Sequence, residues 1–163
     1  MSEILKFFGI GLMLLSALIF SKEYEKHLDM RQGIAEGFLS LLLHVRRQID
    51  CYLTPASRLA DGFSCAPLEK CGFLKEAKEK GVGPAYSSMK DSPLLYESAK
   101  AVLTPLFLNF GKEYKENTVK QIDGAVASLK DILQKEKEES ERSLKVARTL
   151  AVSAALGAAI LII

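Results

Sequence analysis

Two stretches of almost uninterrupted apolar residues stand at the ends of this 163-residue chain. Ile4 to Phe20 contains one charged residue, Lys6, and Thr149 to Ile163 contains none. As helices they would cover ~26 Å and ~23 Å, against a hydrocarbon core of ~30 Å in a bilayer. Small residues, typical of closely packed membrane helices, are frequent in the second stretch. We therefore expect a transmembrane helix at each end.

Each end has an alternative interpretation. The apolar run after Lys6 has the length of a secretory signal peptide, which would be cleaved. The positions where cleavage would fall carry Leu18, Ile19 and Phe20 rather than a small-x-small pattern, so an uncleaved helix is favoured. The C-terminal stretch is short for a span and could instead be a buried core helix.

Helical periodicity dominates the chain between these ends, and no alternating strand pattern occurs. Apolar residues recur at spacings of three and four across Arg31–Cys51 and again across residues 119–133, which predicts two amphipathic helices. The first should continue from the N-terminal stretch with a bend near Asp29. The second should begin near Asn117 and run without interruption to the C terminus. The core positions are Ile34, Phe38, Leu41, Leu42, Val45 and Ile49, then Val119, Ile122, Val126, Leu129 and Leu133.

Prolines and glycines predict shorter helices between these two. Thr54-Pro55 should start a short helix that reaches Asp61, and Pro67 should start another that ends at Gly81. Further helices are expected over Pro84–Lys90 and after the Ser92-Pro93 cap, the last kinked or broken at Pro105, with a turn over Lys112–Asn117.

The fold class that follows is all-α. We expect a small cytosolic bundle of about five or six helices, flanked by N- and C-terminal transmembrane helices, with a long continuous C-terminal helix. The predicted organisation is an N-terminal transmembrane helix (1–21), a helical domain (22–134), a charged helical stalk (135–148) and a C-terminal transmembrane helix (149–163).

Charge is confined to the middle of the chain. Apart from Glu3 and Lys6, every Asp, Glu, Lys and Arg lies between residues 21 and 148, and the net charge is only +2, which argues against a nucleic-acid binder. Lysine and arginine concentrate on the inner flanks of both apolar stretches, so the positive-inside rule predicts a cytoplasmic middle. These residues are Lys22, Lys26, Arg31, Lys135, Lys137, Arg142, Lys145 and Arg148. Cys51, Cys65 and Cys71 would then be free thiols.

The chain offers few residues for catalysis. His27 and His44 are not part of a metal-binding motif, and we predict no catalytic, cofactor-binding or metal site. His44 and Cys51, seven residues apart, could form a base and thiol pair, but a buried cysteine near a partly exposed histidine is far commoner. Arg46-Arg47 beside Asp50 is either a contact for an acidic partner or an ordinary helix surface.

The stretch Arg46 to Pro55, with Ile49-x-x-Tyr52 before Thr54-Pro55, resembles the stage III sporulation protein AB family of endospore-forming bacteria. The resemblance resumes at Phe110–Tyr114, passes through Gln121 and the charged helix, and ends with Lys145 and the apolar terminus. Two departures concern Ala56, where the family commonly has Leu, and Tyr114-Lys115, where many members have Leu-Gly.

The resemblance implies a membrane protein made in the mother cell and required for the channel complex that joins it to the forespore. The family is similar to the cytoplasmic domains of type II secretion inner-membrane platform proteins. It implies a partner, the ATPase-like stage III sporulation protein AA, besides membrane lipid, other channel proteins and possible self-association. The protein would lie in the mother-cell membrane facing the forespore, its soluble domain in the cytoplasm.

We therefore expect a non-enzymatic platform component. The candidate partner-binding residues are Arg46, Arg47, Asp50, Lys112, Glu113 and Gln121. Two alternatives stay open. One is an exported helical protein with a cleaved signal peptide and a membrane-associated C-terminal tail. The other is an enzyme at the membrane surface that uses His44.

Overall fold

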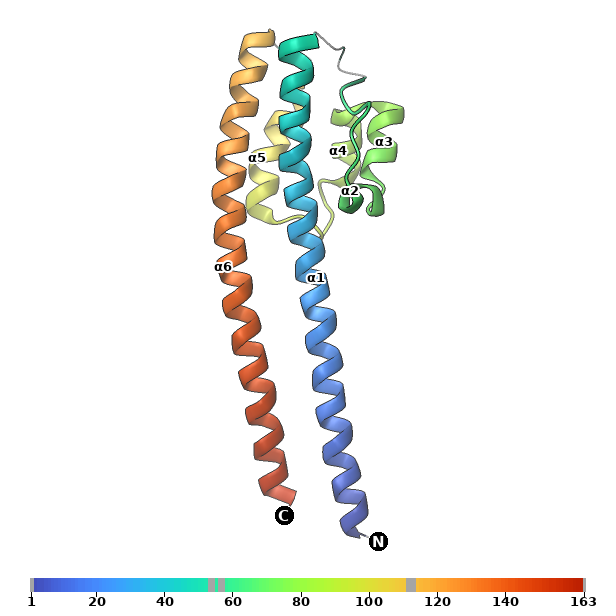
Figure 1. The fold of residues 1–163 in the computed structure, drawn as a ribbon, viewed down its shortest axis with the longest axis vertical. Helices are drawn as coiled ribbons and strands as arrows, with labels where there is room; N and C mark the ends of the chain where they lie inside the picture. The colour runs from blue at the N-terminus through green and yellow to red at the C-terminus, as the bar shows by residue number, and fades with distance from the viewer. Residues whose placement is uncertain (1, 53–54, 56–57, 111–113, 163) are drawn as a thin grey trace. The chain divides into compact units, whose positions relative to one another are not determined.

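A computed structural model describes residues 2–52, 55, 58–110 and 114–162, with side chains described only in part in the two apolar ends. The described residues form helices joined by turns, without a strand (Figure 1). The helices are α1 (Ser2–Tyr52), α2 (Ala66–Lys70), α3 (Phe73–Lys80), α4 (Val82–Met89), α5 (Glu97–Leu108) and α6 (Lys115–Ile162). The all-α class and the long C-terminal helix are thereby confirmed.

The chain divides into two compact units. Met30–Lys135 forms the helical domain, and the residues up to Asp29 together with those from Glu136 form the terminal unit. In the terminal unit, the first residues of α1 and the last residues of α6 lie at the same end (Figure 1). Over the residues that the structure describes, no helix is both long enough and apolar enough to cross a membrane.

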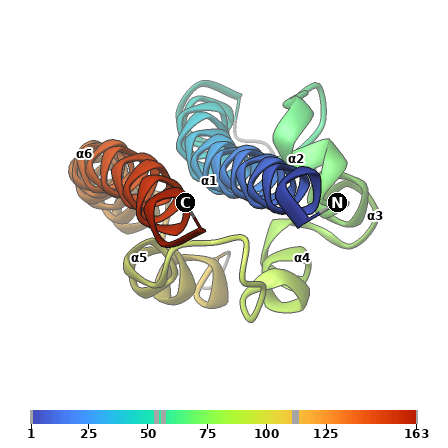
Figure 2. The same cartoon turned by 90° about the horizontal axis from the view of Figure 1, so that it is seen from below.

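The core of the helical domain is built around α1. Figure 2 shows α1 with α6 on one side and α2 and α3 on the other, while α4 and α5 close the remaining side. Ile34, Phe38 and Leu41 are fully buried, as are Leu42 and Val45. The predicted core positions of α1 are therefore confirmed, and the sixth, Ile49, is partly buried at the edge of the core.

α6 covers the core with the face that its periodicity predicts. Ile122 and Leu129 are fully buried and Val126 is 8% exposed. Leu133 packs partly buried against the same core. The helix begins at Lys115, two residues before the predicted start, because the Tyr114 carbonyl accepts hydrogen bonds from the N–H groups of both Asn117 and Thr118.

The helix predicted from Pro67 to Gly81 is two helices in the structure. α2 starts one residue earlier than expected, and Gly72, with φ +82°, separates it from α3. A left-handed residue cannot continue an α-helix, so the chain turns at this glycine. Gly81, at φ +88°, ends α3 as predicted.

Two further predicted boundaries are wrong. α4 begins at Val82 rather than at Pro84, and α5 begins at Glu97. Ser92 does not cap α5, because its hydroxyl instead accepts a hydrogen bond from the Leu94 N–H within a turn. Pro105 lies inside α5, which continues to Leu108 before it ends.

The short helix expected over Pro55–Asp61 lies partly outside the described residues, including its Thr54 cap. Where the chain is described, it forms tight turns. The Arg58 N–H donates to the Pro55 carbonyl, and the Asp61 N–H donates to the Arg58 carbonyl. Each bond spans three residues rather than four, which is the spacing of turns and of the tighter 3₁₀ helix.

Candidate partner-binding surface

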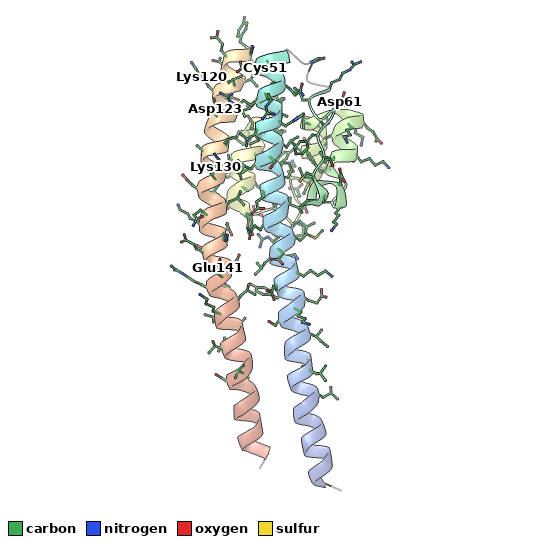
Figure 3. The ribbon with its side chains drawn as sticks, viewed as in Figure 1. Cys51, Asp61, Lys120, Asp123, Lys130 and Glu141 are labelled. Carbon is green, nitrogen blue, oxygen red and sulfur yellow. The ribbon has the colours of Figure 1, made fainter. Side chains whose placement is uncertain are left out.

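The end of α1 is joined to the start of α6 by a two-pronged ion pair. Arg46 donates from Nε to Asp123 Oδ1 at 2.5 Å and from Nη2 to Asp123 Oδ2 at 3.1 Å. This is the bidentate geometry for which the planar guanidinium is suited. Figure 3 shows Asp123 on the early turns of α6 and Cys51 at the end of α1.

Asp50 brings a second cation, Lys115, into this contact. Lys115 donates to the Asp50 backbone carbonyl at 2.9 Å, and its ammonium lies 3.6 Å from Asp50 Oδ1. Arg46 approaches the same carboxylate at 4.0 Å. Arg46, Asp50, Lys115 and Asp123 thus form one cluster, which we call the α1–α6 clasp.

The clasp changes the acid–base properties of its members. The hydrogen bond and the charge of Asp123 raise the pKa of Arg46. In return, the hydrogen bond from Arg46 lowers the pKa of Asp123, and partial burial opposes this only in part. Both side chains remain partly exposed, at 39% and 49%, so solvent screens the pair.

The candidate residues do not form one site in the described part of the chain. Arg46 and Asp50 make contacts within the protein, whereas Arg47 is exposed on the same helix. Gln121 is exposed on α6, on the side that faces α5 rather than α1. Lys112 and Glu113 lie outside the described residues. Binding by any of the six residues stays a prediction.

Gln121 lines a shallow groove between α5 and α6, with a volume of about 210 Å³. Val102, Pro105 and Leu106 form the apolar wall on α5, while Gly124 and Ala125 form the floor on α6. Asn109 and Ser128 complete the lining. The lining therefore contains no charged side chain, and its polar groups are neutral amides and a hydroxyl.

A larger hollow of about 440 Å³ lies between the start of α3, the end of α4 and the turn that follows α4. Cys71 lines it, donates to the Leu68 carbonyl at 3.3 Å and lies 4.0 Å from the Met89 sulfur. Burial raises the pKa of the Cys71 thiol, and the backbone N–H of Phe73 opposes this only in part. A raised pKa leaves less of the Cys71 thiol in the reactive thiolate form at neutral pH.

The histidine and thiol pair considered from the sequence has little support in the geometry. His44 packs against Phe63, with ring centroids 5.3 Å apart, and its Nε2 is buried without a hydrogen-bond partner among the described residues. Cys51 is exposed. No cluster of three His, Cys, Asp or Glu side chains suited to a metal ion occurs in the described part of the chain.

Sequence reasoning missed the partners of the clasp. Asp123 follows the buried Ile122, so the periodicity of α6 places it at the edge of the core. That signal could have identified Asp123 as a boundary residue. Nothing in the sequence pairs it with Arg46, 77 positions away. Gly124 was not identified as a surface residue of interest either, because a single glycine does not interrupt the helical pattern.

The comparison with protein families identifies a family for this chain. The family model described as stage III sporulation protein AB matches residues 6–163. Comparisons with curated proteins and with solved structures each found no match. Since the matched residues span nearly all of the sequence, the chain belongs to the stage III sporulation protein AB family.

Proposed function

We propose that this protein is a non-enzymatic platform component of the channel complex between mother cell and forespore. Its helical domain would bind a cytosolic ATPase-like partner, stage III sporulation protein AA, and its two ends would anchor it in the mother-cell membrane. The observation that carries the proposal is the family match over residues 6–163. The resemblance to platform proteins of type II secretion supplies the role.

Exposed apolar side chains support membrane anchoring. Leu12, Leu15 and Ile19 of α1 are 58%, 61% and 59% exposed, and Leu150 and Val152 of α6 are 63% and 60% exposed. Exposed apolar side chains of this size are costly in water, and a group of them is typical of a membrane or protein contact. Lys145 lies one or two turns before these residues of α6, where a lysine can reach anionic head groups.

The chemistry of the helical domain supports a binding role. The groove between α5 and α6 is lined by apolar side chains, neutral amides and a hydroxyl, and the charged clasp holds α1 to α6. Among the candidate partner-binding residues on α1, Arg47 is the cation that faces solvent. A docking surface for an acidic partner therefore has Arg47 as its clearest candidate, with Gln121 on the neighbouring helix.

The experiment is a binding assay between the full-length protein in detergent and the purified ATPase-like partner. Charge reversal by Arg47→Glu should weaken binding, and Arg47 is exposed and has no ion pair with another described residue that the change would break. Arg46→Glu is less informative, since it also breaks the pair with Asp123. Lys75→Glu, an exposed charge reversal on α3, is the matched control and should bind normally.

Three results would count against the proposal. Failure of the wild-type protein to bind the ATPase-like partner would show that this protein is not its partner. Equal binding by the wild-type and Arg47→Glu proteins would show that Arg47 is not part of the proposed docking surface. A deletion strain that forms normal spores would contradict a required role in the channel complex.

A further inference from the structure

Within the helical domain, α1 exposes one stripe of side chains to solvent. Over residues 34–49, its exposed positions are Glu36, Ser40, Leu43 and Arg47. Spacings of four, three and four residues place all of them on one face of the helix, over ~16 Å. Leu43 is 42% exposed. The stripe therefore has a carboxylate at one end, a guanidinium at the other and an exposed leucine between them.

α6 carries a second exposed stripe beside the first. Asp123, Ala127 and Lys130 are exposed and share one face of this helix; Figure 3 labels the two charged members. Asp123 pairs with Arg46 of α1, which immediately precedes Arg47 of the first stripe. The two stripes are therefore neighbours on one side of the domain. We call them together the α1–α6 face.

The Arg46–Asp123 pair also fixes the register of the two antiparallel helices. Each residue further along α6 lies ~1.5 Å lower, which is one residue back along α1. Ala127 therefore lies at about the level of Leu42, next to that of Leu43. In the same way, Asp123 lies near the level of Arg47, and Lys130 lies within ~5 Å of the level of Glu36. At each level a charge on one stripe corresponds to the opposite charge on the other.

We infer that the α1–α6 face is the contact surface of a dimer of this protein. A two-fold axis parallel to the helices would place α1 of each copy against α6 of the other, at the same level. Leu43 would then pack on Ala127 of the second copy, where the small side chain leaves room for it. This axis lets α1 of both copies enter the domain from the same side, as two chains anchored in one membrane must.

The charges of the face favour a second copy as the occupant. Arg47 would meet Asp123 of the second copy, and Lys130 would meet its Glu36. Neither Arg47 nor Lys130 has an ion pair with another described residue. Asp123 remains 49% exposed beside Arg46, and Glu36 accepts a hydrogen bond from Gln32 through one oxygen only. Both carboxylates can therefore accept a further donor.

The test measures the mass of the full-length protein in detergent by size exclusion with light scattering, together with thermal unfolding of each variant. The wild type should be a dimer. Glu36→Lys and Lys130→Glu each place like charges opposite one another twice, because the contact is symmetric, and should weaken the dimer about tenfold or more. Lys75→Glu, an exposed charge reversal on α3, is the matched control and should remain dimeric.

Exchange of charge gives a readout that a change in folding would not give. An equimolar mixture of the Glu36→Lys and Lys130→Glu proteins should form a mixed dimer, because each copy supplies the charge that the other lacks. The double variant should dimerise alone. Both residues lie outside the candidate partner-binding set and leave Arg47 unchanged, so the outcome is independent of the ATPase-like partner and of the proposed function.

Three results would overturn the inference. The first is a monomeric wild type, which would leave the α1–α6 face to a different protein. The second is a wild-type dimer that both single variants leave intact, which would place the contact elsewhere, such as in the terminal helices. The third is weakening by the single variants that neither the mixture nor the double variant restores.

Discussion

Phe38 links α1 to three other helices through aromatic contacts. Its ring centroid lies 4.8 Å from that of Phe73 on α3, and 6.0 Å from those of Tyr86 on α4 and Phe107 on α5. The side chain is fully buried. Because one residue touches three elements, its truncation removes packing that no neighbour can replace.

We predict that Phe38→Ala lowers the free energy of unfolding by about 3–5 kcal/mol. Phe38→Leu keeps most of the buried volume and should cost less, about 1.5 kcal/mol. Urea denaturation followed by circular dichroism measures both values. Equal losses for the two variants would contradict a role based on filled volume.

Asp123 should make stability depend on pH. Its pKa is lowered in the folded protein by the hydrogen bond from Arg46, so it contributes stability above its unfolded pKa. That contribution is lost as the pH falls through the folded pKa. Asp123→Asn should therefore lower the melting temperature at neutral pH, and the difference from wild type should shrink in acid.

The control for this prediction is Asp131→Asn on the same helix, since Asp131 has no ion pair with another described residue. It should unfold like the wild type at both pH values. A difference between wild type and Asp123→Asn that stays constant from neutral pH into acid would contradict the assignment.

At the scale of elements, the sequence predicts the long helices better than the short ones. The periodicity of α1 and α6 extends over many turns, so single ambiguous positions do not matter. The predicted ends of the short helices between α1 and α6 each depend on a single residue. Gly72 is an ordinary glycine in sequence, and only its φ of +82° divides α2 from α3. Ser92-Pro93 matches a helix cap equally well, yet it forms a turn.

The contact of α1 with α2 gives a prediction at this scale. Gly37 is buried, and its missing Cβ leaves room for Leu68 and for the Cys65 sulfur, which would lie 2.8 Å and 3.0 Å from it. We expect Gly37→Ala to destabilise the protein by about 1–3 kcal/mol, despite the higher helix propensity of alanine. Gly124→Ala on α6 should have the opposite sign. Thermal unfolding of the two variants distinguishes close helix contact from propensity.

For the whole molecule, the sequence supports the fold class and the family, but it does not predict the site. Composition and spacing locate Arg46, Arg47 and Asp50 on one helix, whereas the contact of Arg46 with Asp123 depends on how α6 packs beside α1. The α5–α6 groove likewise depends on two helices that are adjacent only after folding. Contacts between distant residues need the packed structure, because no local pattern encodes them.

The orientation of the chain in the membrane is the last prediction. If both ends are membrane anchors, the helical domain is cytoplasmic and the N terminus lies outside. Exposed Cys51 should then react with a membrane-impermeant maleimide only after cells are permeabilised, and Cys51→Ser should reduce that labelling to the level given by the half-exposed Cys65 and Cys71. Ser2→Cys, made in the Cys51→Ser background and expressed in vegetative cells, should be labelled while the cells are intact. Labelling of native Cys51 in intact cells would contradict a cytoplasmic domain, and it is the result expected for the exported protein with a cleaved signal.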